Sequence, residues 1–212
     1  MRIQRVSPLV VRRLAVYLRI LQRMNPEPDR FISSHELGAR AGVTAAQVRK
    51  DLAFFGQFGK QGVGYHVWDL RKELCRILKA DREIPVGIVG IGELGAALAR
   101  YNLRQEKVQK GYPFRVVALF DNDTRKIGTA VEGLIVRSTS DLSGVVDELG
   151  IKIFMITVPV GSAQEVTDLC VKAGIKAIVN FAPAKVVAPE DVYIHSSDVT
   201  LDLQWLAYYL HD

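Results

Sequence analysis

The fold of most of this chain is decided by one stretch, Ile84-Pro-Val-Gly-Ile-Val-Gly-Ile-Gly-Glu-Leu-Gly95. An apolar run, typical of a buried strand, leads directly into a Gly-x-Gly-x-x-Gly loop that opens a helical segment, which is the context this pattern needs. Gly90 is expected to make a tight turn, Gly92 to let a pyrophosphate approach the backbone, and Gly95 to pack the helix against the strand. The free N–H groups at the start of the helix would also attract phosphate.

The next strand, 114–120, ends in Asp121. A carboxylate at this strand tip accepts hydrogen bonds from both ribose hydroxyls of an adenosine and repels a 2′-phosphate, so it favours NAD over NADP. The distance from the glycine loop is longer than the usual ~20 residues. We assign the excess to a charged loop, 102–113, after a helix that is expected to end near Tyr101.

Alternating strands and helices continue to the end of this region, with strands expected over 151–158 and 174–180 and a helix from about 162 to 173. This order predicts an α/β fold, a Rossmann-like doubly wound sheet. Residues at the tips of the later strands are expected near the nicotinamide, although ordinary strand–helix loops explain any single one equally well. The residues expected to hold NAD(H) are Gly90, Ile91, Gly92, Glu93, Leu94, Gly95, Asp121, Thr157, Val158, Pro159, Asn180 and Phe181.

Positive charge is concentrated in the first part of the 212-residue chain, whose net charge is +5. Residues 1–82 carry 16 Lys and Arg against 7 Asp and Glu, whereas residues 83–212 carry 12 against 16. The first part is therefore +9 and the second −4. Such an asymmetry is typical of a module that binds a polyanion, although a solvated basic face is the simpler alternative.

The same basic region has the pattern of a winged helix-turn-helix. Ser7-Pro8 predicts a capped helix that Asn25-Pro26 stops. Capping boxes at 33–36 and 44–47 predict a helix through Arg40 and another to about Phe55, joined by a turn at Gly42. The glycine-rich segment 58–65 is expected to form a wing. The alternative for each element taken alone is a small helical bundle.

The second of these helices is expected to enter the major groove of DNA. Small residues at its start allow close approach, Gln47 can pair with adenine, and Arg49 and Lys50 can reach guanine or phosphate. The residues expected to contact DNA are Arg13, Thr44, Ala45, Gln47, Arg49, Lys50, Lys60, Gly62 and Tyr65.

The last segment, 198–211, is helical in pattern and apolar nearly all round, which is better explained if it packs against a second subunit. We therefore divide the chain into a DNA-binding domain over 1–82, a nucleotide-binding domain over 83–196 and a dimerisation helix over 197–212. Without a signal sequence or an apolar run of ~18–20 residues, the protein is expected in the cytoplasm, away from membranes. Cys75 and Cys170 are expected to be buried free thiols, and no metal-binding spacing occurs.

Taken together, the motifs resemble the Rex family of redox-sensing transcriptional repressors over essentially the whole chain. The most specific pieces are Gln47-Val-Arg-Lys-Asp-Leu52, Phe55-Gly-Gln-Phe-Gly59, Gly62-Val-Gly-Tyr65, Gly90–Gly95, Asn180-Phe-Ala-Pro183 and Tyr208-Tyr-Leu210. The resemblance implies a homodimer with swapped C-terminal helices that binds inverted-repeat operators and leaves them when NADH accumulates over NAD⁺. It also implies three switch residues, Arg19, Tyr101 and Asp198. Ala53 departs from the family pattern, which often has serine there, and costs at most one phosphate contact.

Two other functions stay open. One is an NAD-dependent oxidoreductase with a basic appendage, although no catalytic residue is assigned and little chain is left for a substrate domain. The other is a regulator that senses a different nucleotide, NADP or coenzyme A, of which Asp121 disfavours NADP.

Overall fold

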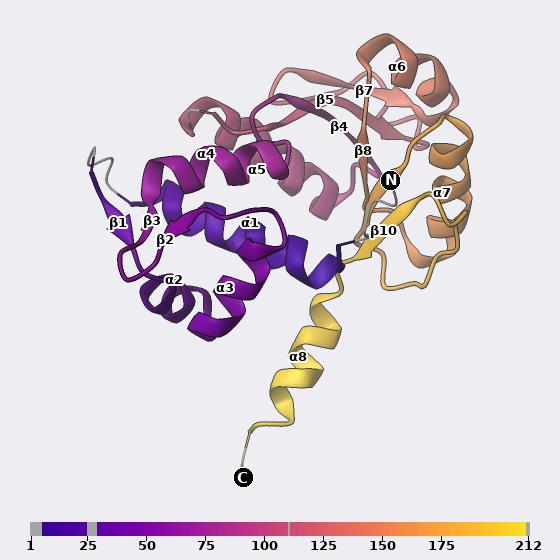
Figure 1. Cartoon of the computed structure of the whole chain (residues 1–212). Helices are drawn as coiled ribbons and strands as arrows, with labels where there is room; N and C mark the ends of the chain where they lie inside the picture. Colours follow the sequence, from indigo (N-terminus) through magenta and orange to yellow (C-terminus); the bar gives the residue numbers. More distant parts are fainter. Residues whose placement is uncertain (1–5, 25–28, 110, 211–212) are drawn as a thin grey trace. The chain divides into compact units, whose positions relative to one another are not determined.

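The structure is a computed structural model that describes residues 6–24, 29–109 and 111–210. The chain divides into two compact units, Met1–Arg82 and Glu83–Asp212 (Figure 1). Each unit has hydrophobic core clusters of its own. The division falls within the charged segment 81–83. The expected helix stop at Asn25-Pro26 lies outside the described residues.

The first unit, the head, is a winged helix-turn-helix, as expected. Two short antiparallel pairings place the strands in the order β1-β3-β2, and the loop between β2 and β3 is the wing. The elements are α1 (Pro8–Gln22), β1 (Phe31–Ile32), α2 (Ser34–Ala41), α3 (Ala45–Ala53), β2 (Gly59–Lys60), β3 (Gly64–His66) and α4 (Val67–Ile77).

The helix boundaries of the head follow from local hydrogen bonds. The side chains of Ser33 and Thr44 accept from the backbone N–H three residues on, at 3.0 and 3.1 Å, which satisfies one free donor at each helix start. The expected cap at Ser7 is wrong in one respect, because its side chain makes no capping bond and only its carbonyl accepts, from Val10 and Val11. α3 ends at Ala53, slightly before the expected Phe55.

One face of each head helix packs into a single core. On α1 the buried positions are Leu14, Tyr17, Leu18 and Leu21, which meet Leu37, Val48 and Leu70 from the other helices. Val11 has the same helical spacing in the sequence and would be expected among these buried residues, but it is 41% exposed, because the buried face of α1 is centred on Leu14 and Tyr17. The shared core holds α3 against α1.

The second unit, the body, is a doubly wound sheet with the strand order β10-β9-β8-β4-β5-β7-β6. All neighbours are parallel except β6 and β7. The order reverses between β4 and β8, the place where such sheets bind ligands. The strands are β4 (Ile84–Val89), β5 (Phe114–Asp121), β6 (Ala130–Val131), β7 (Leu134–Ser138), β8 (Ile153–Ile156), β9 (Ala177–Asn180) and β10 (Tyr193–Ser196).

Helices cover both faces of this sheet. α5 (Glu93–Val108) packs with Ile88 and Leu119 on one face, whereas α6 (Leu142–Leu149) and α7 (Ala163–Lys172) pack with Phe120 and Phe154 on the other. Neighbouring residues of β5 thus point to opposite faces, as the pleat of a strand requires. Two short 3₁₀ helices, Thr139–Asp141 and Val160–Ser162, precede α6 and α7.

Two features of the body differ from expectation. α5 continues to Val108 instead of ending near Tyr101, so most of the expected loop 102–113 is helical. Asn102 supports the extra turns, because its amide donates to Leu98 O and its carbonyl accepts from the Tyr112 hydroxyl. In addition, β6, β7 and α6 occupy a part of the chain for which the sequence patterns predict no element.

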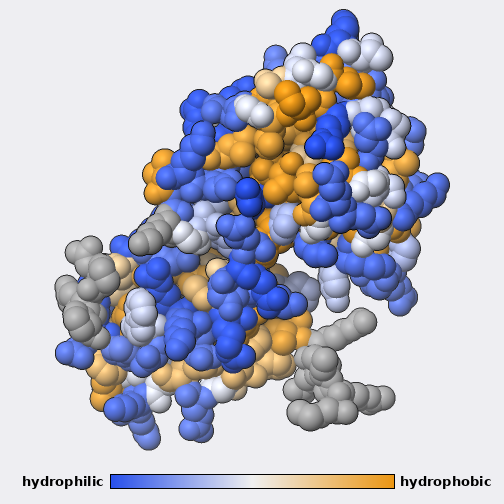
Figure 2. Space-filling view, turned by 90° about the horizontal axis from the view of Figure 1, so that it is seen from above, coloured by the Kyte–Doolittle hydropathy of each residue, from blue (hydrophilic) through white to orange (hydrophobic). Residues whose placement is uncertain are grey.

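The last helix, α8 (Val199–Ala207), belongs to the body but buries none of its residues. Its large apolar side chains are more than half exposed, among them Leu203 at 61% and Trp205 at 62%. Apolar residues also gather in patches elsewhere on the surface (Figure 2). No helix in the described part of the chain is long and apolar enough to cross a membrane.

Candidate functional site

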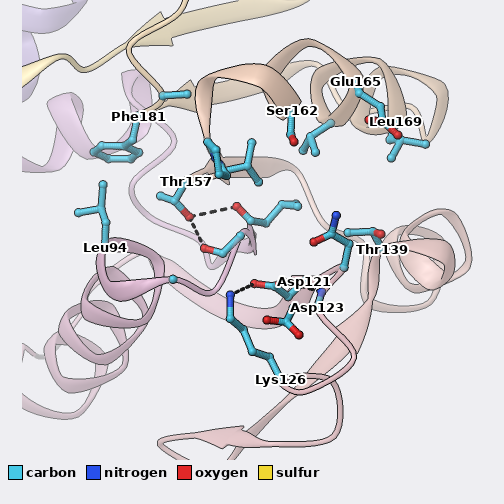
Figure 3. A pocket seen from close by; sticks show the side chains of 18 of the residues that line it. Leu94, Asp121, Asp123, Lys126, Thr139, Thr157, Ser162, Glu165, Leu169 and Phe181 are labelled. Carbon is cyan, nitrogen blue, oxygen red and sulfur yellow. Dashed lines mark hydrogen bonds and ion pairs between the residues drawn. The ribbon is translucent and has the colours of Figure 1, made fainter.

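A pocket of about 610 Å³ lies at the carboxyl ends of the central strands of the body (Figure 3). It is lined by residues that follow β4, β5, β7, β8 and β9 and by the first turns of α5 and α7. Its volume lies in the range of small-molecule and cofactor sites, about 300–1,000 Å³. Leu94 and Phe181 lie at one end, and Asp121, Asp123 and Lys126 lie at another (Figure 3).

The three glycines of the loop have different reasons to lack a side chain. Gly90 has a φ of +94°, and a β-carbon there would stand 2.7 Å from Val158 Cγ1. A β-carbon on Gly95 would collide with the carbonyl of Gly90. Gly92 differs, because a β-carbon there would meet no protein atom within 4 Å. Gly92 is therefore open to the pocket, as the approach of a pyrophosphate to the backbone requires.

Asp121 ends β5 and is only 5% exposed. Its Oδ2 accepts from the Ile91 N–H at 2.7 Å and from the Lys126 ammonium at 3.0 Å, and its Oδ1 accepts from the Asp123 N–H at 2.9 Å. Burial alone would raise the pKa of Asp121, but these donors outweigh it and hold the pKa below its ordinary value. The side chain is thus an ionised acceptor at the rim of the pocket, suited to ribose hydroxyls.

Thr157 and Asn180 hold the ends of the strands around the pocket in place through their hydrogen bonds. The Thr157 hydroxyl lies 2.7 Å from Gly90 O and 3.0 Å from Val89 O, so it links the ends of β4 and β8 across the switch point. Asn180 is fully buried, and its amide donates to Ala182 O and Ala184 O while its carbonyl accepts from the Ala182 N–H. Asn180 therefore folds the loop that carries Phe181.

The structure brings most of the expected nucleotide-binding residues to this one pocket. Nine of them line it, namely Gly90, Gly92, Glu93, Leu94, Asp121, Thr157, Val158, Pro159 and Phe181. Ile91, Gly95 and Asn180 do not line it; Ile91 supports the lining through its backbone N–H, and the other two support it through their packing and hydrogen bonds. The lining residues that sequence reasoning missed include Asn122, Asp123, Lys126, Thr139, Ser162, Glu165 and Leu169.

In the head, exposed basic side chains lie on α3 and at the wing, as well as on other helices. Lys50 and Lys60 are exposed, and Gly62, with a φ of +79°, forms the tip of the wing. Arg49 is also exposed, and its guanidinium donates to Ser34 Oγ at 2.9 Å. Ala45 is half-buried, and Thr44, the exposed cap, precedes it at the start of α3. These residues present positive charge and a narrow helix start on one small domain.

Two other expected DNA contacts, Arg13 and Gln47, are held by a buried carboxylate. Asp51 is 1% exposed and accepts from Arg13 Nε at 2.6 Å, Arg13 Nη2 at 2.7 Å, the Tyr17 hydroxyl at 2.9 Å and the Gln47 amide at 2.7 Å. All four acceptor positions of the carboxylate are filled. Burial opposes the charge, but these donors outweigh it and lower the pKa of Asp51. This cluster ties α1 to α3.

Tyr65 is also placed differently from the expectation of a DNA contact. It is only 8% exposed and packs in the head core, and burial raises the pKa of its hydroxyl. Its neighbour Gly64 has a φ of +107°, and a β-carbon there would stand 2.5 Å from Ile32 O. The pair fixes the wing against β1, so Tyr65 is placed to shape the wing.

Comparison with known proteins covers both units. A family model described as "CoA binding domain" matches residues 81–184, and one described as "Putative DNA-binding protein N-terminus" matches residues 5–53. The redox-sensing transcriptional repressor Rex of Roseiflexus sp. (strain RS-1) is 43% identical over 210 residues, which cover 99% of this chain and 93% of the relative. The Rex of Natranaerobius thermophilus is 44% identical, with 96% and 90% covered. The chain belongs to the Rex family.

Solved structures of a Rex-family repressor, RSP, have the same fold. RSP in complex with β-NAD⁺ and operator DNA has a TM-score of 0.86 and 35% identity, with 96% of this chain and 91% of RSP covered. RSP in complex with β-NADH has a TM-score of 0.83 and 33% identity, with 97% and 94% covered.

The three switch residues implied by the Rex resemblance lie on three different helices. Arg19 is exposed on α1, and Tyr101 is 58% exposed on α5. Asp198 is the N-cap of α8, and its Oδ1 accepts from the Thr200 N–H at 2.9 Å. Their role in switching stays a prediction.

The two thiols have surroundings that suit packing. Cys170 is buried, which raises the pKa of its thiol to about 12. Cys75 is half-buried, and its pKa is also raised by burial. A raised pKa leaves little reactive thiolate at neutral pH, so neither residue has the character of a redox-sensing cysteine.

Proposed function

We propose that this Rex-family protein represses transcription by binding an inverted-repeat operator and that NADH releases it. The observation that carries the proposal is the open approach at Gly92 beside the ionised acceptor Asp121, in a chain whose other unit is a winged helix-turn-helix. The relatives are named redox-sensing repressors, and RSP has been solved with β-NAD⁺ and operator DNA and with β-NADH.

The residues present fit a dinucleotide. The N–H groups at the start of α5 and the bare backbone of Gly92 would hold the pyrophosphate, and Asp121 would hold the adenosine ribose. Leu94 and Phe181 provide an apolar end for the nicotinamide. When bound, the cofactor supplies a ring that is cationic in NAD⁺ and neutral in NADH, and this difference in charge is what a sensor can read. We infer that the pocket serves sensing and not hydride transfer.

In the head, α3 would enter the major groove, with Lys50, Arg49 and the wing residue Lys60 contacting DNA. Because Asp51 holds the amide of Gln47, this side chain enters the groove with its carbonyl as the readier partner. Two heads on a palindromic site require two chains, and the exposed apolar helix α8 is the element we assign to dimerisation. We propose that it does so by exchange between protomers.

Coenzyme A is a second candidate ligand, because the matching family model for 81–184 carries that description. Its adenosine ribose bears a phosphate, which the carboxylate of Asp121 would repel, so we favour NAD(H). Substitution of Asp121 by alanine separates the two ligands. It should weaken NADH binding strongly, whereas an unchanged NADH affinity would favour coenzyme A.

The function is tested by the anisotropy of a labelled palindromic operator fragment during titration with NADH, with NAD⁺, NADPH and coenzyme A as controls. The proposal expects release by NADH at concentrations at which NADPH and coenzyme A leave the complex intact. A hundredfold change in DNA affinity would need about 2.7 kcal/mol of coupling between the sites. DNA binding that ignores all four ligands would overturn the sensing role.

A further inference from the structure

Lys126 lies at the rim of the pocket, where sequence patterns gave it no role. Its ammonium is 3.0 Å from Asp121 Oδ2, and it lines the pocket beside Asp121 and Asp123 (Figure 3). Asp121 is nearly buried, whereas the Lys126 side chain is 39% exposed. The acceptor expected to recognise the ribose is thus already covered, in part, by a cation that can reach solvent.

Asp121 has too few acceptor positions to bind both a ribose and all of its present donors, Lys126 included. A carboxylate offers about four lone-pair positions, and three are taken by the Ile91 N–H, the Asp123 N–H and Lys126. A ribose with two free hydroxyls needs two positions, so one of the three donors must leave. Ile91 and Asp123 donate through backbone held at the ends of β4 and β5. Lys126 donates from the end of a flexible side chain, so it is the donor that can be exchanged.

After leaving Asp121 the ammonium must stay close by, because the backbone of Lys126 is fixed. Its N–H donates to Asp123 O at 2.9 Å, and its carbonyl accepts from the Thr129 N–H at 2.9 Å. The side chain can therefore swing only about this anchored position. Since Asp121 marks the ribose hydroxyls, the released ammonium would lie at the edge of the ribose.

We propose that Lys126 is a specificity-determining residue, displaced from Asp121 by the adenosine ribose and then facing its 2′-position, where it moderates the rejection of a 2′-phosphate. This inference rests on the proposed NAD(H) function. The natural chain therefore prefers NADH to NADPH by less than Asp121 alone would impose. Lys126 sets how sharply the sensor separates the two reduced dinucleotides.

The test measures the dissociation constants of NADH and NADPH directly, by nicotinamide fluorescence, for the full chain and for Lys126→Met. NADPH binding should weaken about tenfold, a change of about 1.4 kcal/mol. NADH binding should stay unchanged or tighten, because its competitor for Asp121 is gone. If NADPH binds the natural chain too weakly to measure, the same pair is compared in an Asp121→Asn background, in which Lys126→Met should still weaken NADPH about tenfold.

Arg125→Met is the matched control. Arg125 carries the same charge at the adjacent position, but it is 88% exposed, pairs with Asp123 and does not line the pocket. This variant should leave the ratio of the two constants within twofold. Equal shifts in both variants would indicate a general charge effect and overturn the proposal, as would equal weakening of NADH and NADPH by Lys126→Met. A natural chain that binds no NADH would instead overturn the proposed function itself.

Discussion

At the scale of single residues, Gly90 and Gly92 are glycines for different reasons, one for folding and the other for binding. Gly90 is a glycine because the fold demands it, since its φ of +94° and the nearby Val158 leave no place for a side chain. Gly92 has an ordinary φ of −81° and open space in front of it. The protein itself gives no packing reason for a glycine at 92, and because Gly92 also lines the pocket, we assign the glycine to the approach of a ligand.

We therefore expect Gly92→Ala to fold normally, within about 0.5 kcal/mol of the natural chain in urea denaturation. The added methyl group would occupy the space for the pyrophosphate, so NADH binding measured by fluorescence should weaken at least about tenfold, or ~1.4 kcal/mol. Gly90→Ala is the contrasting control and should lose about 1–3 kcal/mol of stability through backbone strain. A Gly92→Ala protein that binds NADH normally would contradict the assignment of this loop.

Whether a site residue could be predicted from the sequence depends on whether it lies next to an element with a recognisable pattern. Asp121 was predictable because it directly follows a strand of recognisable pattern. Lys126 was not, because it reaches the pocket through the turn 123–129, which no periodicity reports. Arg13 and Gln47 were assigned to DNA from their position on exposed-looking helix faces. Gln47 donates to Asp51 four positions later on the same helix, a contact that helical spacing permits. Arg13 is 38 positions from Asp51, and only the packing of α1 on α3 brings these two together.

At the scale of elements, the carboxylate of Asp51 joins α1 and α3 of the head. We expect Arg13→Met to destabilise the protein by about 3 kcal/mol, the lower end for a broken buried pair, because the Arg13 side chain is 26% exposed. Arg12→Met removes the same charge from the exposed face of α1 and should cost less than about 0.5 kcal/mol. Urea denaturation of both variants measures the difference, and equal costs would contradict a structural role for the pair.

The lowered pKa of Asp51 predicts how this contribution depends on pH. A carboxylate with a depressed folded-state pKa stabilises the protein fully above its unfolded value of about 3.9, and the stabilisation is lost as the pH falls through the folded-state value. The stability advantage of the natural chain over Asp51→Asn should therefore be constant above about pH 5 and shrink below about pH 4. An advantage that grows on acidification would contradict an ionised Asp51.

The boundaries of some helices and strands could be predicted from the sequence, whereas others could not. β4 was predictable to the residue, since a continuous apolar run ends at a glycine loop. α5 was not, because its last turns are polar and depend on Asn102 and Tyr112, which meet only in the folded chain. β6 has only two residues, and the apolar run of β7, Leu134-Ile-Val136, has only three, so both are too short for a periodic pattern.

At the scale of the whole molecule, we propose that α8 packs against a second copy of the chain. A helix with Leu203, Trp205 and Leu206 all more than half exposed would leave a large apolar surface in water. We expect Trp205→Asp to convert a dimer into single chains, as measured by light scattering, and to weaken binding to a palindromic operator while a half-site is bound as before. Gln204→Asp adds the same charge at an exposed polar position of α8 and should remain dimeric. A natural chain that is monomeric at micromolar concentration would contradict this role of α8.

We propose that the dinucleotide pocket of the body controls DNA binding by the head. The most direct measurement follows the anisotropy of a labelled palindromic operator during NADH titration of the natural chain and of Gly92→Ala side by side. Both proteins should bind the operator equally well without NADH, and only the natural chain should be released as NADH is added. Release of both proteins at the same NADH concentration, or of neither, would contradict control through this pocket.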